Sequence, residues 1–162
     1  MQILIVYDSF FGNTEKIAAA IASSLKASLG DRAAVELLQA GQVKRFQYEG
    51  RDLLVVGSPT RGFRPTDDLA NLLDRLAPNA LQGMRVAAFD TRFKADELDS
   101  TVTRFIVKTG GYAAARIAAR LKKAGATLVV PPEGFYVTDI EGPLKEGELE
   151  RAAAWASQLL AG

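Results

Sequence analysis

Short apolar runs alternate with helical patterns along the whole chain, and this alternation restricts the fold more than any other feature. Runs typical of buried strands cover residues 3–7, 34–38, 53–56 and 84–89, and a fifth covers 127–130 and 134–137, interrupted by two prolines. Apolar residues at helical spacing occupy residues 13–29, 66–76, 112–124 and 147–160. Because crossovers between parallel strands are right-handed, five such βα units predict a parallel sheet with helices on both faces.

Three stretches lie between these elements. Residues 39–46 are expected to form a short helix or a loop, and residues 57–65 a polar loop with glycine and proline. Residues 90–111 are compatible with a short helix around 102–107 packed against the core, or with an insertion that covers a ligand. In such sheets ligands bind outside the carboxyl ends of the strands. The loops that begin at Asp8, Gly57 and Asp90 are therefore the candidates for a site.

The composition narrows the chemistry. The chain has 162 residues, enough for one domain spanning residues 1–162, and its formal net charge of +1 gives no reason to expect nucleic acid or an anionic membrane as a partner. It contains no Cys and no His, which excludes disulfides, thiolate nucleophiles, iron–sulfur ligation and the usual general base. Redox work by this chain would need an organic cofactor.

The location of the protein is predicted from what the chain lacks. No segment approaches the 18 or more apolar residues of a membrane helix. The N-terminal apolar run has no basic leader and is interrupted at Asp8, so it does not resemble a signal peptide. A cytoplasmic location is the expectation.

The first candidate loop, after residues 3–7, has the features of an anion site. The first N–H groups of a helix lack partners inside it, and the helix dipole adds positive potential there. Ser9, Asn13 and Thr14 offer side-chain donors, and Gly12 lets the backbone approach an anion closely. The loop has neither the GxxxxGK[ST] nor the GxGxxG spacing and no Lys or Arg, which indicates a monophosphate held by neutral donors. The same residues also suit a helix cap without any ligand.

Two motifs resemble the flavodoxin family. Residues 5–21, IVYDSFFGNTEKIAAAI, resemble the flavodoxin signature of two aliphatics, an aromatic, Ser or Thr, a small residue, Thr, and then Ala with an aliphatic residue. Residues 57–62, GSPTRG, look like the second flavin loop of that family at the expected distance. The resemblance covers essentially the whole chain. It implies an α/β, three-layer, doubly wound fold with a five-stranded parallel sheet in the order 2-1-3-4-5, and FMN as the cofactor.

The resemblance also implies which residues bind FMN. The phosphate would lie on the first loop and the ring between the second and third. The cofactor-binding residues so implied are Ser9, Phe10, Phe11, Gly12, Asn13 and Thr14 in the first loop, Ser58, Pro59, Thr60, Arg61, Gly62 and Phe63 along the ring, and Asp90, Thr91, Arg92 and Phe93 at its pyrimidine side.

The chain departs from the family pattern at two positions. Phe11 stands where members often have a third hydroxyl, and one lost donor is worth about 0.5–1.5 kcal/mol or more against a charged group. Arg61 stands where an aromatic residue often stacks on the flavin. Its guanidinium can stack on a flat ring, or Phe63 can take that place. Ordinary packing is the alternative for Phe63 and Phe93.

Arginines in the ring loops suggest a consequence for the redox potential. Reduced flavin is anionic near neutral pH in this fold. A positive charge roughly 7 Å away, at an effective dielectric of about 20, would stabilise that anion by about 2 kcal/mol, which shifts a one-electron potential by on the order of 100 mV. The hypothesis is that this chain has a less negative low-potential couple than acidic flavodoxins. Solvated charge is the alternative role for Arg61, Arg64 and Arg92.

Three functions remain open at this stage. The first is an FMN-dependent electron carrier that exchanges electrons with a redox partner protein or a small-molecule acceptor, with no catalytic residue and no metal. The second is an NAD(P)H- or quinone-dependent FMN oxidoreductase on the same fold, with Arg61, Arg64 or Arg92 holding the second substrate. The third is a flavin-free interaction module. The near-neutral charge weakens the usual ferredoxin-replacing role, because acidic flavodoxins are steered to basic partners.

Overall fold

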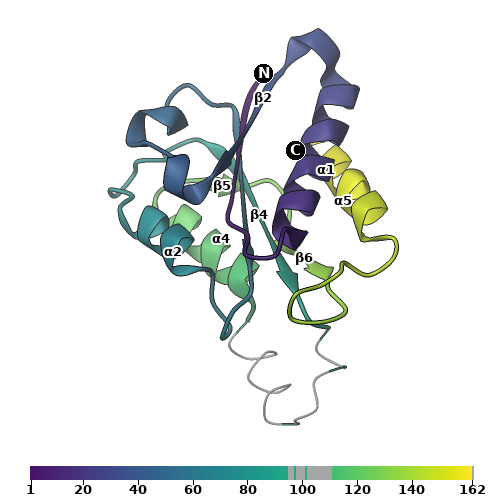
Figure 1. The fold of residues 1–162 in the computed structure, drawn as a ribbon. Coiled ribbons are helices and arrows are strands. Elements are labelled where there is room, and N and C mark those ends of the chain that lie inside the picture. The colour runs from purple at the N-terminus through teal and green to yellow at the C-terminus, as the bar shows by residue number, and fades with distance from the viewer. Residues whose placement is uncertain (95–96, 98–100, 102–110, 162) are drawn as a thin grey trace.

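The protein is a parallel sheet covered on both faces by helices (Figure 1). The computed structural model describes residues 1–94, 97, 101 and 111–161. The strands are β1 (Gln2–Tyr7), β2 (Ala34–Gln39), β3 (Leu53–Pro59), β4 (Arg85–Arg92), β5 (Thr127–Leu128) and β6 (Glu133–Tyr136). The α-helices are α1 (Asn13–Leu29), α2 (Asp67–Asp74), α4 (Ala113–Lys123) and α5 (Glu148–Gln158), and 3₁₀ turns cover η1 (Gly30–Arg32), η2 (Ala40–Gln42) and η3 (Arg45–Tyr48).

The strand order is β2-β1-β3-β4-β5, as predicted. The interrupted fifth strand is also confirmed. Its halves β5 and β6 pair with different parts of β4, both in parallel, with Arg85 opposite Thr127 and Phe89 opposite Glu133.

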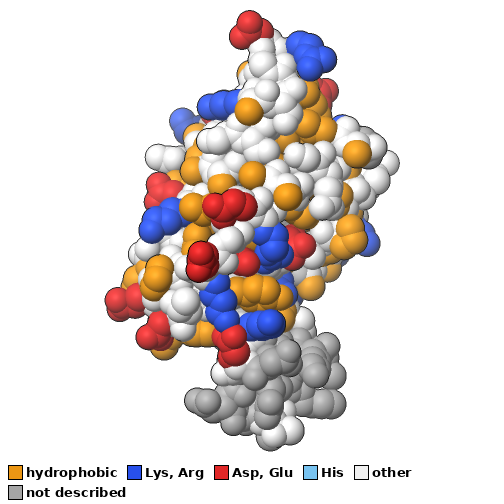
Figure 2. All heavy atoms as spheres, turned by 90° about the vertical axis from the view of Figure 1, so that its right-hand side faces the viewer, with side chains coloured by type: hydrophobic (Ala, Val, Ile, Leu, Met, Phe, Trp, Pro, Cys, Tyr) orange, Lys and Arg blue, Asp and Glu red, His pale blue; other side chains and the backbone are white. Residues whose placement is uncertain are grey.

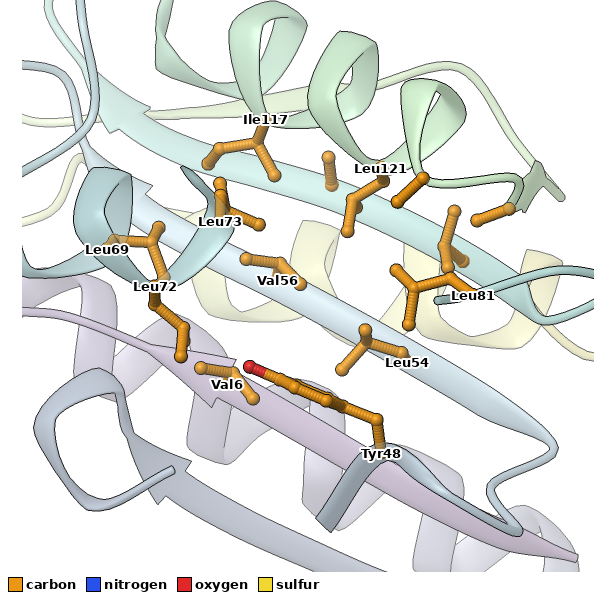
Figure 3. Packing of buried hydrophobic residues seen from close by; sticks show 14 of the residues in the cluster. Val6, Tyr48, Leu54, Val56, Leu69, Leu72, Leu73, Leu81, Ile117 and Leu121 are labelled. Atoms are coloured by element: carbon orange, nitrogen blue, oxygen red, sulfur yellow. The ribbon is translucent and has the colours of Figure 1, made fainter. Parts of the chain in front are cut away.

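Alternate residues of each central strand face opposite helical layers. On one face, Val6, Leu54 and Val56 form one apolar cluster with Tyr48 and with residues of α2 and α4 (Figure 3). On the other, Ile3, Leu53, Phe89 and their neighbours pack against α1 and α5, which lie together in Figure 1. Burial on both faces explains why these strands are apolar throughout.

Most predicted elements lie where the sequence placed them, with two extensions. Helix α1 has the predicted bounds, 13–29, and Thr66 caps α2 by accepting a hydrogen bond from the Leu69 N–H. Strand β3 runs on to Pro59 and β4 to Arg92, although both ends were predicted to belong to loops. Pairing of Ser58 with Asp90 holds the extra residues in the sheet. The predicted short helix at 102–107 lies outside the described residues.

Candidate functional site

Three loops meet at the carboxyl edge of the sheet, at the bottom of Figure 1. The Asp8 N–H donates to the Gly57 carbonyl over 3.1 Å, and the Thr60 N–H donates to the Thr91 carbonyl over 2.9 Å. These bonds tie the first loop to the second and the second to the third. The loops surround a pocket of about 710 Å³, including the part open to solvent, which is within the range of small-molecule sites.

The side chains that line the pocket come from the three loops and one further segment. They are Ser9, Phe10, Phe11, Asn13, Thr14, Pro59, Thr60, Arg61, Gly62, Thr91, Arg92, Phe93, Val137 and Ile140.

The first loop presents the N-terminus of α1 to this pocket. Gly12 takes a φ of 85°, which glycine adopts without steric cost, and its N–H donates to the Ser9 hydroxyl over 3.0 Å. Among the described residues, none accepts a hydrogen bond from the backbone N–H of Asn13, Thr14 or Glu15. Three such donors at a helix end, beside two hydroxyls, fit a phosphate group.

Two hydrogen bonds hold the start of α1 in place. The Thr14 and Thr91 hydroxyl oxygens are 2.8 Å apart in a buried contact between the first turn of α1 and the end of β4. The Asn13 amide donates to the Glu141 carbonyl over 3.1 Å, which ties α1 to the segment after β6. These two hydrogen bonds therefore fix the N-terminus of α1 both to β4 and to the segment after β6.

The second loop forms a tight turn. Arg61 and Arg64 exchange both backbone hydrogen bonds, and Gly62 and Phe63 between them have positive φ angles of 53° and 65°. Positive φ at both central positions is the mark of a type I′ turn. The Arg61 guanidinium carbon lies 4.6 Å from the centroid of the Phe10 ring. Arg61 thus lines the pocket, whereas Phe63 does not.

The end of β4, just before the third loop, carries an ion pair inside the protein. Asp90 is fully buried, and its carboxylate accepts from Arg92 Nε at 2.5 Å, from Arg92 Nη2 at 2.9 Å and from the Ala114 N–H at 2.8 Å. The Arg92 guanidinium also lies 3.7 Å from the Tyr112 ring centroid. Burial raises the pKa of Asp90, while Arg92, the Ala114 N–H and Thr60 act against that rise. The predicted alternative of solvated charge therefore does not describe Arg92.

Most predicted cofactor residues line the pocket, and four do not: Gly12, Ser58, Phe63 and Asp90. Gly12 acts through its backbone at the start of α1. Ser58 is fully buried, and its hydroxyl is satisfied inside the protein: it accepts from the Thr66 N–H and donates to the Pro59 carbonyl. The Asp90 carboxylate is buried in its ion pair with Arg92 and does not line the pocket.

Two lining residues, Val137 and Ile140, were not predicted. They follow β6, and the same rule that placed the other loops at the carboxyl edge could have found them. In the described part of the chain, none of the helices combines the length and the apolar character that a membrane span needs, and no three acidic residues come together in a way that could hold a metal ion.

Comparisons with known proteins agree with this geometry. The family model described as Flavodoxin matches residues 5–155. The oxidised Flavodoxin 2 from Bacillus cereus is 26% identical to this chain, with 99% of each chain covered and a TM-score of 0.76. The oxidised Flavodoxin 1 from Bacillus cereus is 18% identical, with 99% of this chain and 98% of that chain covered and a TM-score of 0.76. Rubredoxin oxygen:oxidoreductase from Desulfovibrio gigas is 20% identical, with 99% of this chain but 35% of that chain covered and a TM-score of 0.71. A search of curated proteins found no match.

Proposed function

This chain belongs to the flavodoxin family, and from that premise we propose that it is an electron carrier that works without a catalytic residue of its own. FMN is its cofactor, and electrons pass between it and a redox partner. When bound, FMN supplies the one- and two-electron chemistry. With no His and no Cys in the chain, the protein's tasks are to bind, orient and shield the cofactor.

The main support for the proposal is that the first residues of α1 line the pocket. The N–H groups of Asn13, Thr14 and Glu15 and the hydroxyls of Ser9 and Thr14 would hold the phosphate. These donors are neutral, so the helix dipole supplies most of the positive potential.

The remaining walls of the pocket suit a flat ring. Pro59 ends β3, and Thr60 and Arg61 follow it on the second loop; Thr91 lies at the end of β4, and Phe93 begins the third loop. We assign the ring to the space between them. The Thr14–Thr91 hydrogen bond would keep the phosphate end and the ring end at a constant separation.

We propose that residues 1–162 form one domain, since the two apolar layers share a single sheet. A cytoplasmic location stays a prediction. So does the choice between a partner protein and a small-molecule acceptor as the electron-exchange partner.

The visible spectrum of the purified protein, with release of its cofactor, tests the proposal. We expect a yellow protein with one FMN per chain. Thr14→Val should weaken FMN binding about tenfold or more, because it removes a hydroxyl that would face a charged group. Thr127→Val is the matched control, since Thr127 is exposed on the far part of the sheet.

Two outcomes would contradict the carrier assignment. A colourless protein that does not quench the fluorescence of added FMN would indicate a flavin-free module. Rapid steady-state oxidation of NAD(P)H with a quinone acceptor would indicate an oxidoreductase.

A further inference from the structure

A second groove adjoins the flavin pocket, and three arginines are among its eight lining residues. Its lining residues are Phe10, Arg61, Gly62, Arg64, Pro65, Thr66, Asp67 and Arg116. Phe10, Arg61 and Gly62 line both cavities, so the groove is continuous with the proposed flavin site.

Among the described residues, few acidic side chains offset the positive charge of this groove. Within the described residues, Arg61, Arg64 and Arg116 form no ion pair, although Arg51, Arg92, Arg120 and Arg151 each pair with a carboxylate. One acidic side chain, Asp67, also lines the groove, and it stands in the first turn of α2, where the helix dipole favours a negative charge. The groove therefore carries a net positive charge, in contrast to the face of α1 and α5, where acidic and basic side chains are interspersed (Figure 2).

The turn that presents Arg61 and Arg64 is energetically costly. The two arginines stand directly opposite each other, where like charges destabilise a pair. Phe63, a bulky residue, is held at positive φ between them. Local cost of this kind is characteristic of functional positions.

An aromatic side chain is exposed beside the arginines. Phe10 is 57% exposed and lines the groove as well as the flavin pocket. The Arg61 guanidinium over the Phe10 ring joins the apolar and the basic parts. Aromatic residues and arginine are enriched at the centres of protein interfaces, which favours a protein over a small anion as the occupant.

We propose that the basic groove of Arg61, Arg64 and Arg116, with the exposed Phe10 ring beside Arg61, is the docking surface for an acidic electron-transfer protein. This inference rests on the proposed function, because the groove borders the flavin pocket. Positive charge there attracts an acidic partner during the encounter, and the Phe10 ring buries apolar area once contact is made. The polarity is opposite to that of an acidic flavodoxin that docks on basic partners.

The first test needs no flavin. A fluorescein-labelled peptide of ten glutamates is titrated with the protein at low salt, and binding is followed by fluorescence anisotropy. We expect saturable binding that weakens as salt is added, because screening reduces charge attraction. The double variant Arg64→Gln/Arg116→Gln should bind about fivefold more weakly or worse.

The control variant is Lys122→Gln/Lys123→Gln, at the other end of α4. Both double variants lose two positive charges, which takes the formal net charge from +1 to −1. An equal loss in both variants would mean that only net charge matters and would overturn the proposal. Displacement of the peptide by NADPH, but not by NADH, would assign the groove to a nucleotide phosphate and would also overturn it.

The second test measures electron exchange at the same surface. Photoreduced holoprotein is mixed in a stopped flow with ferricyanide or with hexaamminecobalt(III), and each oxidant ion accepts one electron from the reduced FMN. We expect the rate with ferricyanide to fall as salt is raised and the rate with the cobalt cation to rise, with both slopes reduced in Arg64→Gln/Arg116→Gln. Opposite slopes overturn the proposal. Failure of the protein to hold FMN would refute the proposed function instead, and the peptide titration would still decide the docking surface.

Discussion

Replacing Arg92 by Met is expected to destabilise the protein strongly, because it leaves the Asp90 carboxylate buried without its counter-charge. Asp90 is fully buried, the Arg92 side chain is 16% exposed, and the pair is bidentate. Removing one partner of a buried ion pair costs about 3–5 kcal/mol. For a chain of this size that corresponds to a fall in Tm on the order of 10 °C.

The loss should depend on pH, and the sign follows from the linkage of protons to folding. In Arg92→Met the pKa of Asp90 in the folded state rises further above its unfolded value, since burial already raises it and Arg92 no longer opposes the rise. Between the two pKa values the folded state binds more protons than the unfolded state, so stability falls as pH rises through that window. The difference from wild type should therefore be largest at neutral pH and should shrink as pH falls toward the unfolded pKa.

Urea denaturation at several pH values measures the effect, with Asp90→Asn/Arg92→Met as the matched variant. Asparagine removes the charge but keeps an oxygen that can accept from the Ala114 N–H, so it should recover most of the lost stability. A loss in Arg92→Met that is equal at pH 5 and pH 8, or that the added Asp90→Asn does not reduce, would refute this account.

Two further changes test the core and the ring loops. Gly57→Ala should lower the free energy of unfolding, measured by urea denaturation, by about 1–3 kcal/mol, because the added methyl group would overlap the Phe89 ring. Gly41→Ala is the control, since the space around Gly41 is open, and it should leave the urea midpoint unchanged. Equal midpoints for the two variants would show that the Phe89 ring can move away. Potentiometry of Arg61→Ala should give a more negative low-potential couple, by up to about 100 mV, while Lys123→Ala should leave it unchanged. An unchanged or less negative potential in Arg61→Ala would contradict the charge hypothesis.

Features set by local interactions could be predicted from the sequence. The bounds of α1 follow from helically spaced apolar residues that end at Gly30, which takes a positive φ of 54°. The βα alternation and the apolar runs predicted a parallel sheet buried on both faces. The family resemblance added the strand order, which the structure confirms. The first loop was recognisable because its donors are close together in the chain.

The tertiary structure decided what depends on distant residues. The sequence alone predicted that Arg92 contacts the flavin ring, holds a second substrate or is a solvated charge, but the fold buries Asp90 beside it and makes the two residues an ion pair. Val137 and Ile140 belong to the pocket because β6 ends beside β4, more than forty residues earlier in the chain. Burial and pairing arise from elements brought together by the core, so no spacing within a single motif can reveal them.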